Sequence, residues 1–160
     1  MTTFEHTRIV FQRKEYSVDE FLLLKGLPFE VEVIQNQIVE FTSDSDQMPF
    51  QTSGSTGAPK TIFHKKKYLI ASALRTLDFF DLKRGGSALC MLPAQYTGGA
   101  MMLIRALVGG LTLYLIEPKL STKHIPLVDF LPCTPAQFSW MLENQILSGF
   151  DGKILLGGAP

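Results

Sequence analysis

The hydrophobic positions of the first third of the chain follow a helical spacing. A helix is predicted over residues 31–41, with one apolar face formed by Val31, Ile34, Ile38 and Phe41. Ser17, with Glu20 three positions later, has the form of a capping box, so a second helix is predicted to begin there. A strand-like run at residues 8–11 precedes this cap. The polar residues 42–47 predict a loop.

From Met48 onward, short apolar runs alternate with helical patterns. Strands are predicted at residues 50–52, 61–63, 88–92, 111–116, 130–133 and 153–156. Helices are predicted around a face made by Leu69, Ile70, Ala73, Leu74 and Leu77, over residues 100–108, and from the cap Thr134 to about Asn144. Apolar strands that alternate with helices are typical of a parallel sheet covered on both faces. We therefore predict an α/β fold with a mostly parallel sheet flanked by helices.

Composition narrows the class of protein. The 160 residues are 46% hydrophobic, which is enough for a packed core and excludes wholesale disorder. The 15 Lys and Arg balance the 15 Asp and Glu, which argues against a nucleic-acid or membrane-surface partner. Two cysteines are too few for a disulfide scaffold, and the N-terminus lacks the apolar core of a signal peptide. These features predict a soluble, cytoplasmic, globular protein.

One stretch has the clearest chemical character. It consists of Thr52, Ser53, Gly54, Ser55, Thr56, Gly57, Ala58, Pro59 and Lys60. Its glycines allow backbone N–H groups to approach a ligand, its hydroxyls can donate to anionic oxygens, and its lysine adds a positive charge, a combination that suits a polyphosphate. Pro59 stands where a Walker A loop needs glycine, so we predict a loop between two strands. Composition alone leaves a solvated Gly/Ser turn as an open alternative.

These residues resemble the phosphate-binding signature of the acyl-adenylate-forming (AMP-binding) superfamily, which includes acyl-CoA synthetases, luciferases and peptide-synthetase adenylation domains. Three further matches follow in the same order. Residues 92–99 resemble the Leu-Pro segment of the superfamily, residues 134–137 its Pro-x-Gln helix start, and residues 155–160 its Gly-Gly-Ala turn. Within the superfamily, the set is most similar to the o-succinylbenzoate–CoA ligases of menaquinone biosynthesis. The resemblance covers residues 48–160 well and the first 47 residues poorly.

The resemblance implies ATP-dependent adenylation of a carboxylic acid, followed by transfer to CoA, with Mg²⁺ bridging phosphate oxygens. It implies that residues 48–160 form the nucleotide-binding α/β portion of a large N-terminal domain, without the C-terminal lid domain. We expect residues 1–47 to be an N-terminal segment that packs on this core. The implied phosphate-binding residues are Thr52, Ser53, Gly54, Ser55, Thr56, Gly57 and Lys60. The implied acyl-substrate pocket comprises Tyr96, Thr97, Gly98 and Gly99, and the implied adenine contacts are Gly157, Gly158, Ala159 and Pro160.

Several residues keep two interpretations. Tyr96 replaces the histidine of many superfamily members; it either walls the acyl pocket or packs as a core tyrosine at a helix entry. Arg105 either forms a surface salt bridge, which we favour, or reaches an anionic substrate tail. His64 and the following lysines either form a solvated face, which we favour, or raise the local concentration of ATP. Cys90, Cys133 and Trp140 are interpreted as core rather than catalytic. Met91, Met101 and Met102 either pack in the core or line a pocket.

The sequence stops at Pro160, directly after a predicted strand. It lacks the superfamily's acidic magnesium ligand, its ribose-binding aspartate, its hinge and the lid domain with the catalytic lysine. We therefore expect a fragment that does not complete the reaction alone. Two alternatives stay open: a ligase for another aryl or fatty acid, and a non-catalytic nucleotide-binding module. The sequence does not determine the oligomeric state.

Overall fold

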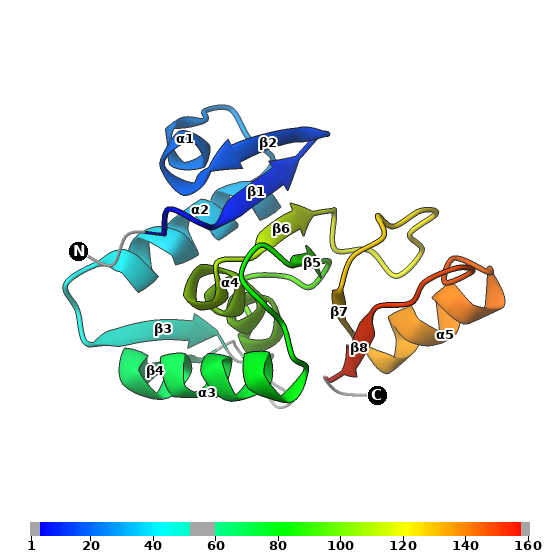
Figure 1. The fold of residues 1–160 in the computed structure, drawn as a ribbon. Helices are drawn as coiled ribbons and strands as arrows, with labels where there is room; N and C mark the ends of the chain where they lie inside the picture. Colours follow the sequence, from blue (N-terminus) through cyan, green and yellow to red (C-terminus); the bar gives the residue numbers. More distant parts are fainter. Residues whose placement is uncertain (1–3, 52–59, 158–160) are drawn as a thin grey trace.

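The computed structural model describes residues 4–51 and 60–157 (Figure 1). In chain order the elements are β1 (Arg8–Phe11), β2 (Lys14–Ser17), α1 (Val18–Leu23), α2 (Phe29–Thr42), β3 (Gln47–Gln51), β4 (Thr61–Lys65), α3 (Lys66–Phe79), β5 (Ser87–Cys90), α4 (Thr97–Gly109), β6 (Thr112–Leu115), β7 (Phe130–Cys133), α5 (Pro135–Glu143) and β8 (Lys153–Leu156). From β4 onward strands and helices alternate as the hydrophobic pattern predicts, except that β7 follows β6 with no helix between them.

The main sheet has six strands in the order β2-β1-β6-β5-β7-β8. All neighbouring pairs are parallel except β1 and β2, which form an antiparallel hairpin at one edge. Figure 1 shows β1, β2 and α1 at one end of the molecule and β7, β8 and α5 at the other. The mostly parallel α/β architecture predicted from the sequence is confirmed.

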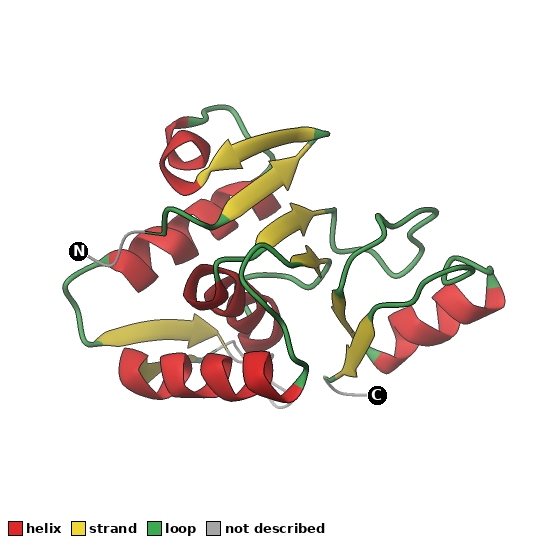
Figure 2. Cartoon of the chain, in the orientation of Figure 1, coloured by secondary structure: helices red, strands yellow, loops and turns green. Residues whose placement is uncertain are grey.

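Strand β5 is buried on both of its faces. Ala88 and Cys90 belong to a large core that includes residues of α2, α3 and α4. Leu89 and Met91 belong to a second, smaller core that includes Met141 of α5. Figure 2 shows α5 beside the β7–β8 end of the sheet and the other long helices away from it. This two-sided burial explains why the strand is an unbroken apolar run rather than an alternating one.

The helix caps and one helix face follow the sequence closely. Ser17 and Glu20 form the predicted capping box, and Thr134 forms another, with Pro135 in the first turn of α5. The buried residues of α2 are the predicted Val31, Ile34, Ile38 and Phe41.

Helix α3 packs through a narrower face than predicted. Leu69, Ala73 and Leu77 are buried, but Ile70 and Leu74 are 37% and 52% exposed. The helix packs mainly against α4, and one side of it suffices for that contact. The predicted five-residue apolar face of α3 is therefore wrong for Ile70 and Leu74.

The β1–β2 hairpin was not predicted. Its turn residues, Gln12 and Arg13, both have positive φ, at 50° and 64°. Such two-residue turns normally carry Asn-Gly or a similar pair, so the sequence offers no turn signal here. Strand β2 is polar, and no apolar periodicity marks it either.

A side-chain clamp joins the start of β5 to the start of β7. The Asp129 carboxylate accepts hydrogen bonds from the Ser87 backbone N–H (2.6 Å) and from the Ser87 hydroxyl (2.8 Å). The Ser87 hydroxyl in turn accepts from the Asp129 N–H at 3.0 Å. These Ser87 bonds, the backbone one first, hold the pKa of the Asp129 carboxyl below its ordinary value.

Replacing Asp129 by Asn is expected to lower the free energy of unfolding by about 1 kcal/mol at pH 7. This is the low end for hydrogen bonds to a charged group, because the carboxylate is solvent-exposed. A depressed pKa stabilises the fold above the ordinary carboxyl pKa, and that stabilisation disappears as the pH falls through the folded value. The difference between the wild type and D129N should therefore shrink below about pH 4.

Urea unfolding at pH 7 and pH 3 measures this difference. Asp151→Asn is the matched control, since it removes an exposed carboxylate close to β8. A D129N defect that is equally large at both pH values would contradict the clamp.

Candidate functional site: the carboxyl edge of the sheet

The carboxyl ends of the parallel strands define where a ligand can bind. The chain passes from β5 to β6 on one side and then to β7 on the other side of β5, so the strand order reverses between β5 and β7. In open α/β sheets, ligands bind in the crevice at such a switch point, outside the carboxyl ends of the strands. The segments that follow β5 and β7, residues 91–96 and Thr134, therefore border the expected crevice.

The β3–β4 hairpin is attached to this edge. Gln51, the last residue of β3, donates its N–H to the Gln95 carbonyl at 3.2 Å and forms a parallel bridge with Tyr96. Gln51 also pairs with Thr61, the first residue of β4. The predicted phosphate-binding residues 52–59 lie between these two strands and outside the described residues, while Lys60 is described and exposed. The structure therefore describes the end of β3 and the start of β4, which flank the predicted phosphate segment. The end of β3 is hydrogen-bonded to Gln95, the residue before Tyr96.

Helix α4 begins at this same place. Tyr96 is its half-buried N-cap residue, and Thr97, Gly98 and Gly99 form its first turn. The sequence placed these glycines before a helix at residues 100–108, so the predicted start is wrong by three residues. Two consecutive glycines weaken helix propensity, which explains the error.

Gly99 explains why a glycine is needed in this turn. A Cβ at Gly99 would lie 2.6 Å from the carbonyl oxygen of Leu92 and closer still to that of Pro93. At Gly98 the nearest atom to such a Cβ would be Leu92 Cδ1, at 3.3 Å. The predicted close approach is therefore present at Gly99, which packs against the backbone carbonyls of Leu92 and Pro93. At Gly98 the contact is looser and involves only a side chain.

Strand β8 adds one more residue to this edge. The Gly157 N–H donates to the Cys133 carbonyl at 3.1 Å, which continues the parallel pairing of β7 and β8 to their carboxyl ends. Gly157 thus lies at the carboxyl edge of the sheet, and its adenine contact stays a prediction. Gly158, Ala159 and Pro160, the other predicted adenine contacts, lie outside the described residues.

Gln137 contributes to the site in a way that the sequence did not reveal. Its side-chain oxygen accepts from the Thr134 N–H at 3.0 Å, as a capping box requires. Its amide nitrogen donates to the carbonyl of Met91, at 3.1 Å, and more weakly to that of Lys119, at 3.4 Å. The Pro-x-Gln spacing marks the cap, but no local signal indicates a bond to a residue 46 positions away.

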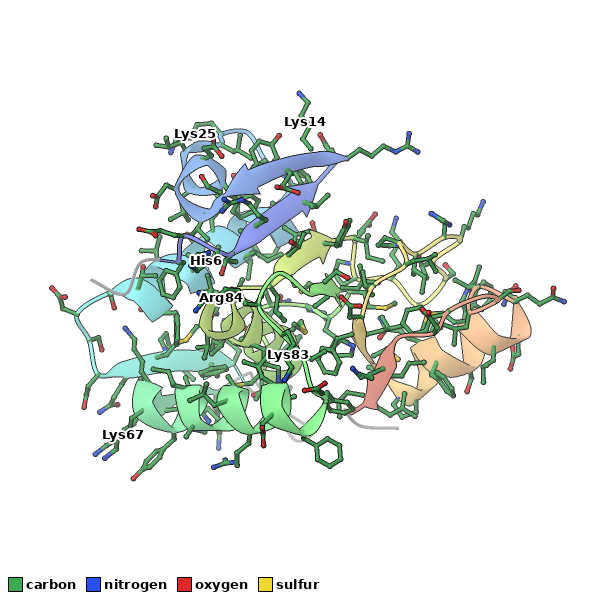
Figure 3. All side chains as sticks on the ribbon, in the orientation of Figure 1. His6, Lys14, Lys25, Lys67, Lys83 and Arg84 are labelled. Atoms are coloured by element: carbon green, nitrogen blue, oxygen red, sulfur yellow. The ribbon has the colours of Figure 1, made fainter. Side chains whose placement is uncertain are left out.

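The charged residues around the site divide into three cases. Lys66, predicted to be solvated, is only 9% exposed and donates to the Ser43 carbonyl at 2.7 Å, which corrects that prediction. His64 is exposed on β4, with the ring of Phe50 edge-on at 5.3 Å. Lys67 is exposed and extends away from the protein at the start of α3 (Figure 3).

Arg105 lies half-buried in the otherwise apolar helix α4, and burial lowers the pKa of its guanidinium. Its Nε is buried and makes no hydrogen bond within residues 4–51 and 60–157, and none of the ion pairs there involves it. The favoured surface salt bridge therefore does not form among these residues.

The thiols do not have the character of nucleophiles. Burial raises the pKa of Cys90, and likewise that of Cys133, to about 11, so both remain protonated near neutral pH. Both cysteines are free and buried, as predicted. Among the described residues, no group of three or more His, Cys, Asp or Glu could hold a metal ion. In the same part of the chain, no helix has the length and apolarity needed to cross a membrane.

The fold defines an α/β protein with a mostly parallel sheet, and the segments after β5 and β7, together with the attached β3–β4 hairpin, border its carboxyl edge. The family model of the AMP-binding enzymes matches residues 16–160, and the chain belongs to that family.

Similar proteins agree with this assignment. The 2-succinylbenzoate–CoA ligase of Staphylococcus aureus (strain MRSA252) is 27% identical over 115 residues, which are 68% of this chain and 23% of the ligase. The chain thus spans less than a quarter of the length of this relative.

Two solved structures are also similar. The acyl-CoA synthetase (AMP-forming)/AMP-acid ligase II-like protein of Dyadobacter fermentans superimposes with a TM-score of 0.77 at 30% identity, covering 91% of this chain and 43% of that one. The R195K variant of E. coli MenE with bound OSB-AMS gives a TM-score of 0.56 at 27% identity, covering 70% of this chain and 25% of that one.

Proposed function

We propose that this chain is the nucleotide-binding part of an AMP-forming acid–thiol ligase whose preferred acid is o-succinylbenzoate. Residues 1–47 pack on the core, and residues 48–160 carry the nucleotide and acyl sites. The observation that carries the proposal is the bond from Gln51 to Gln95, because it attaches the hairpin of the phosphate segment to the segment that begins α4. The likeness to the Staphylococcus aureus ligase supports the choice of acid.

In this proposal, residues 52–60 hold the β- and γ-phosphates of ATP. The hydroxyls of Ser53, Ser55 and Thr56 donate to phosphate oxygens, and Lys60 neutralises charge on them. Tyr96 and the first turn of α4 wall the acyl pocket, where the phenol is able to hydrogen-bond a carboxylate. Gly157, at the end of β8, begins the turn that contacts adenine.

The reaction needs little acid–base chemistry. The substrate carboxylate attacks the α-phosphorus of ATP, pyrophosphate leaves, and an acyl-adenylate forms; the CoA thiol then attacks the acyl carbon and AMP is released. Catalysis of this kind depends on positioning and on charge neutralisation. Magnesium would bridge phosphate oxygens of ATP and neutralise part of their charge.

A wider acid specificity is the second candidate. The Dyadobacter fermentans acyl-CoA synthetase-like protein matches more of this chain, and at higher identity, than the Staphylococcus aureus ligase does. This favours an acyl-CoA synthetase for another aryl or fatty acid. Substrate-dependent ATP–pyrophosphate exchange over a panel of acids, using the gene product that carries this chain, separates the two. Exchange that is fastest with o-succinylbenzoate supports the first candidate, and exchange that is faster with another acid supports the second.

Replacing Lys60 by Ala is expected to weaken ATP binding about tenfold, since a charge-assisted contact to phosphate contributes on the order of 1.5 kcal/mol. Isothermal titration of residues 1–160 with MgATP measures the affinity. Lys67→Ala is the matched control, because it removes the same charge from an exposed position on α3. Equal affinities for K60A and the wild type would remove Lys60 from the site.

A further inference from the structure

Gln137 is one of only three buried polar or charged side chains in the described part of the chain, with Thr7 and Lys66. It is 6% exposed, and its amide is used entirely on backbone groups. These groups belong to the segments that follow three neighbouring parallel strands: Met91 after β5, Lys119 after β6 and Thr134 after β7. A single side chain thus connects the three segments that border the carboxyl edge.

The helix cap alone does not require a glutamine. The capping box of α5 needs only a side-chain oxygen that accepts from the Thr134 N–H, which a glutamate supplies equally well. The amide nitrogen takes no part in the cap. It makes a buried, long-range hydrogen bond of 3.1 Å to the Met91 carbonyl instead. A carboxylate in the same place would face that carbonyl without a proton to donate.

Met91 is the last residue before the segment that shapes the proposed acyl site. Leu92 and Pro93 follow it, and their carbonyls lie against Gly99 in the first turn of α4. The Tyr96 N–H donates to the Pro93 carbonyl at 3.2 Å, and Tyr96 in turn accepts from Ala100 at 3.0 Å. A shift of Met91 would therefore displace Tyr96 and the start of α4 through these backbone contacts.

We propose that Gln137 is a positioning residue of the acyl site: its amide nitrogen, by holding the Met91 carbonyl, fixes the place of Tyr96 and of the first turn of α4. The proposal rests on the proposed function, since it takes these residues as the wall of the acyl pocket. Gln137 itself contacts no substrate; it acts through the 91–99 segment.

Gln137→Glu separates the positioning bond from the cap. The glutamate keeps the acceptor for Thr134 in both protonation states, but it donates to Met91 only when protonated. Burial raises the pKa of a glutamate carboxyl above its ordinary value of about 4.3. At mildly acidic pH the carboxyl of Q137E is therefore protonated and again donates to the Met91 carbonyl. Lys119 and Glu117, on the segment packed against Gln137, pair with each other at 2.6 Å. Gln137→Met, which keeps the length without a donor, is the pH-insensitive comparison.

Binding of OSB-AMS and of MgATP to residues 1–160 is measured by titration at pH 8 and pH 5. Relative to the wild type at the same pH, Q137E should bind OSB-AMS about tenfold more weakly at pH 8 and within about twofold at pH 5, while Q137M is weak at both. The affinity for MgATP should change by less than about twofold. Asn144→Ala is the control, because this amide on the same helix bonds only locally, to the Trp140 carbonyl. A ratio of Q137E to wild type that does not depend on pH overturns the proposal.

A second readout does not depend on the proposed function. The backbone amide resonances of Leu92, Tyr96 and Gly98 should shift in Q137E at pH 8, return toward the wild-type positions at pH 5, and stay unchanged in N144A. If the wild type binds neither ligand, the proposed function fails. If these resonances stay in place in Q137E, the positioning role fails.

Discussion

Gly99→Ala is expected to destabilise the protein by about 3 kcal/mol, more than any other single substitution proposed here. The added methyl would overlap the carbonyl oxygens of Leu92 and Pro93, which are backbone atoms and cannot rotate away. Overpacking against well-packed surroundings costs about 1–3 kcal/mol, and the upper end applies where backbone has to move. Relief requires α4 to move away from the end of β5, which also displaces Tyr96 and the wall of the proposed acyl pocket. Urea denaturation gives the change in the free energy of unfolding.

Gly98→Ala is the matched control for this prediction. A methyl at Gly98 meets only a side-chain carbon of Leu92, at 3.3 Å, and alanine is favoured over glycine in a helix by about 1 kcal/mol. The free energy of unfolding of G98A should therefore stay the same or rise by up to about 1 kcal/mol. If G99A were as stable as G98A, the close packing of α4 on the 92–93 backbone would be wrong.

The parts of the fold that the sequence predicts are those determined locally. Strands β1, β7 and β8 have the predicted bounds, and the two capping boxes begin α1 and α5 as expected. In each case the signal lies within a few residues: an apolar run between turn residues, or a Ser or Thr three positions before Glu or Gln. The four buried positions of α2 follow from its spacing alone.

The parts that the sequence misses depend on tertiary contacts. The sequence predicts the two strands that flank the loop, but it does not show that β3 and β4 form a two-stranded sheet apart from the main one. The sequence indicates that Gln137 bonds to Thr134, three residues away, as part of a capping box. It does not indicate the bond from Gln137 to the Met91 carbonyl. For the site, the structure places Tyr96 and Gly157 at the carboxyl edge of the sheet, which the motifs did not specify, and their acyl and adenine contacts stay predictions. Residues 52–59 and 158–160 lie outside the described residues and also stay predictions.

Lys66 is the clearest case of a residue whose environment the sequence misrepresents. Three consecutive lysines at a helix start are unfavourable for the helix dipole, and a run of like charges in the sequence favours a solvated face. In the structure, the Lys66 ammonium turns back to the carbonyl (2.7 Å) and hydroxyl (3.1 Å) of Ser43, the residue that ends α2. A cation at the carboxyl end of a helix is stabilised by that helix's dipole and satisfies one of its unpaired carbonyls. Lys66 thus joins the end of α2 to the start of α3.

Lys66→Met is therefore expected to lower the free energy of unfolding by about 2 kcal/mol, the typical contribution of hydrogen bonds to a charged group. Methionine keeps most of the apolar stem, so the loss reports on the ammonium rather than on packing. Lys67→Met removes the same charge one residue further along, where the exposed ammonium lies over the Tyr68 ring at 5.1 Å from its centroid, and should change stability by no more than about 0.5 kcal/mol. Urea unfolding of both variants decides the matter. Equal effects would mean that the net charge of the lysine run matters and the bond to Ser43 does not. A loss confined to K66M would show that this bond attaches α3, and with it the hairpin that carries the predicted phosphate segment, to the core.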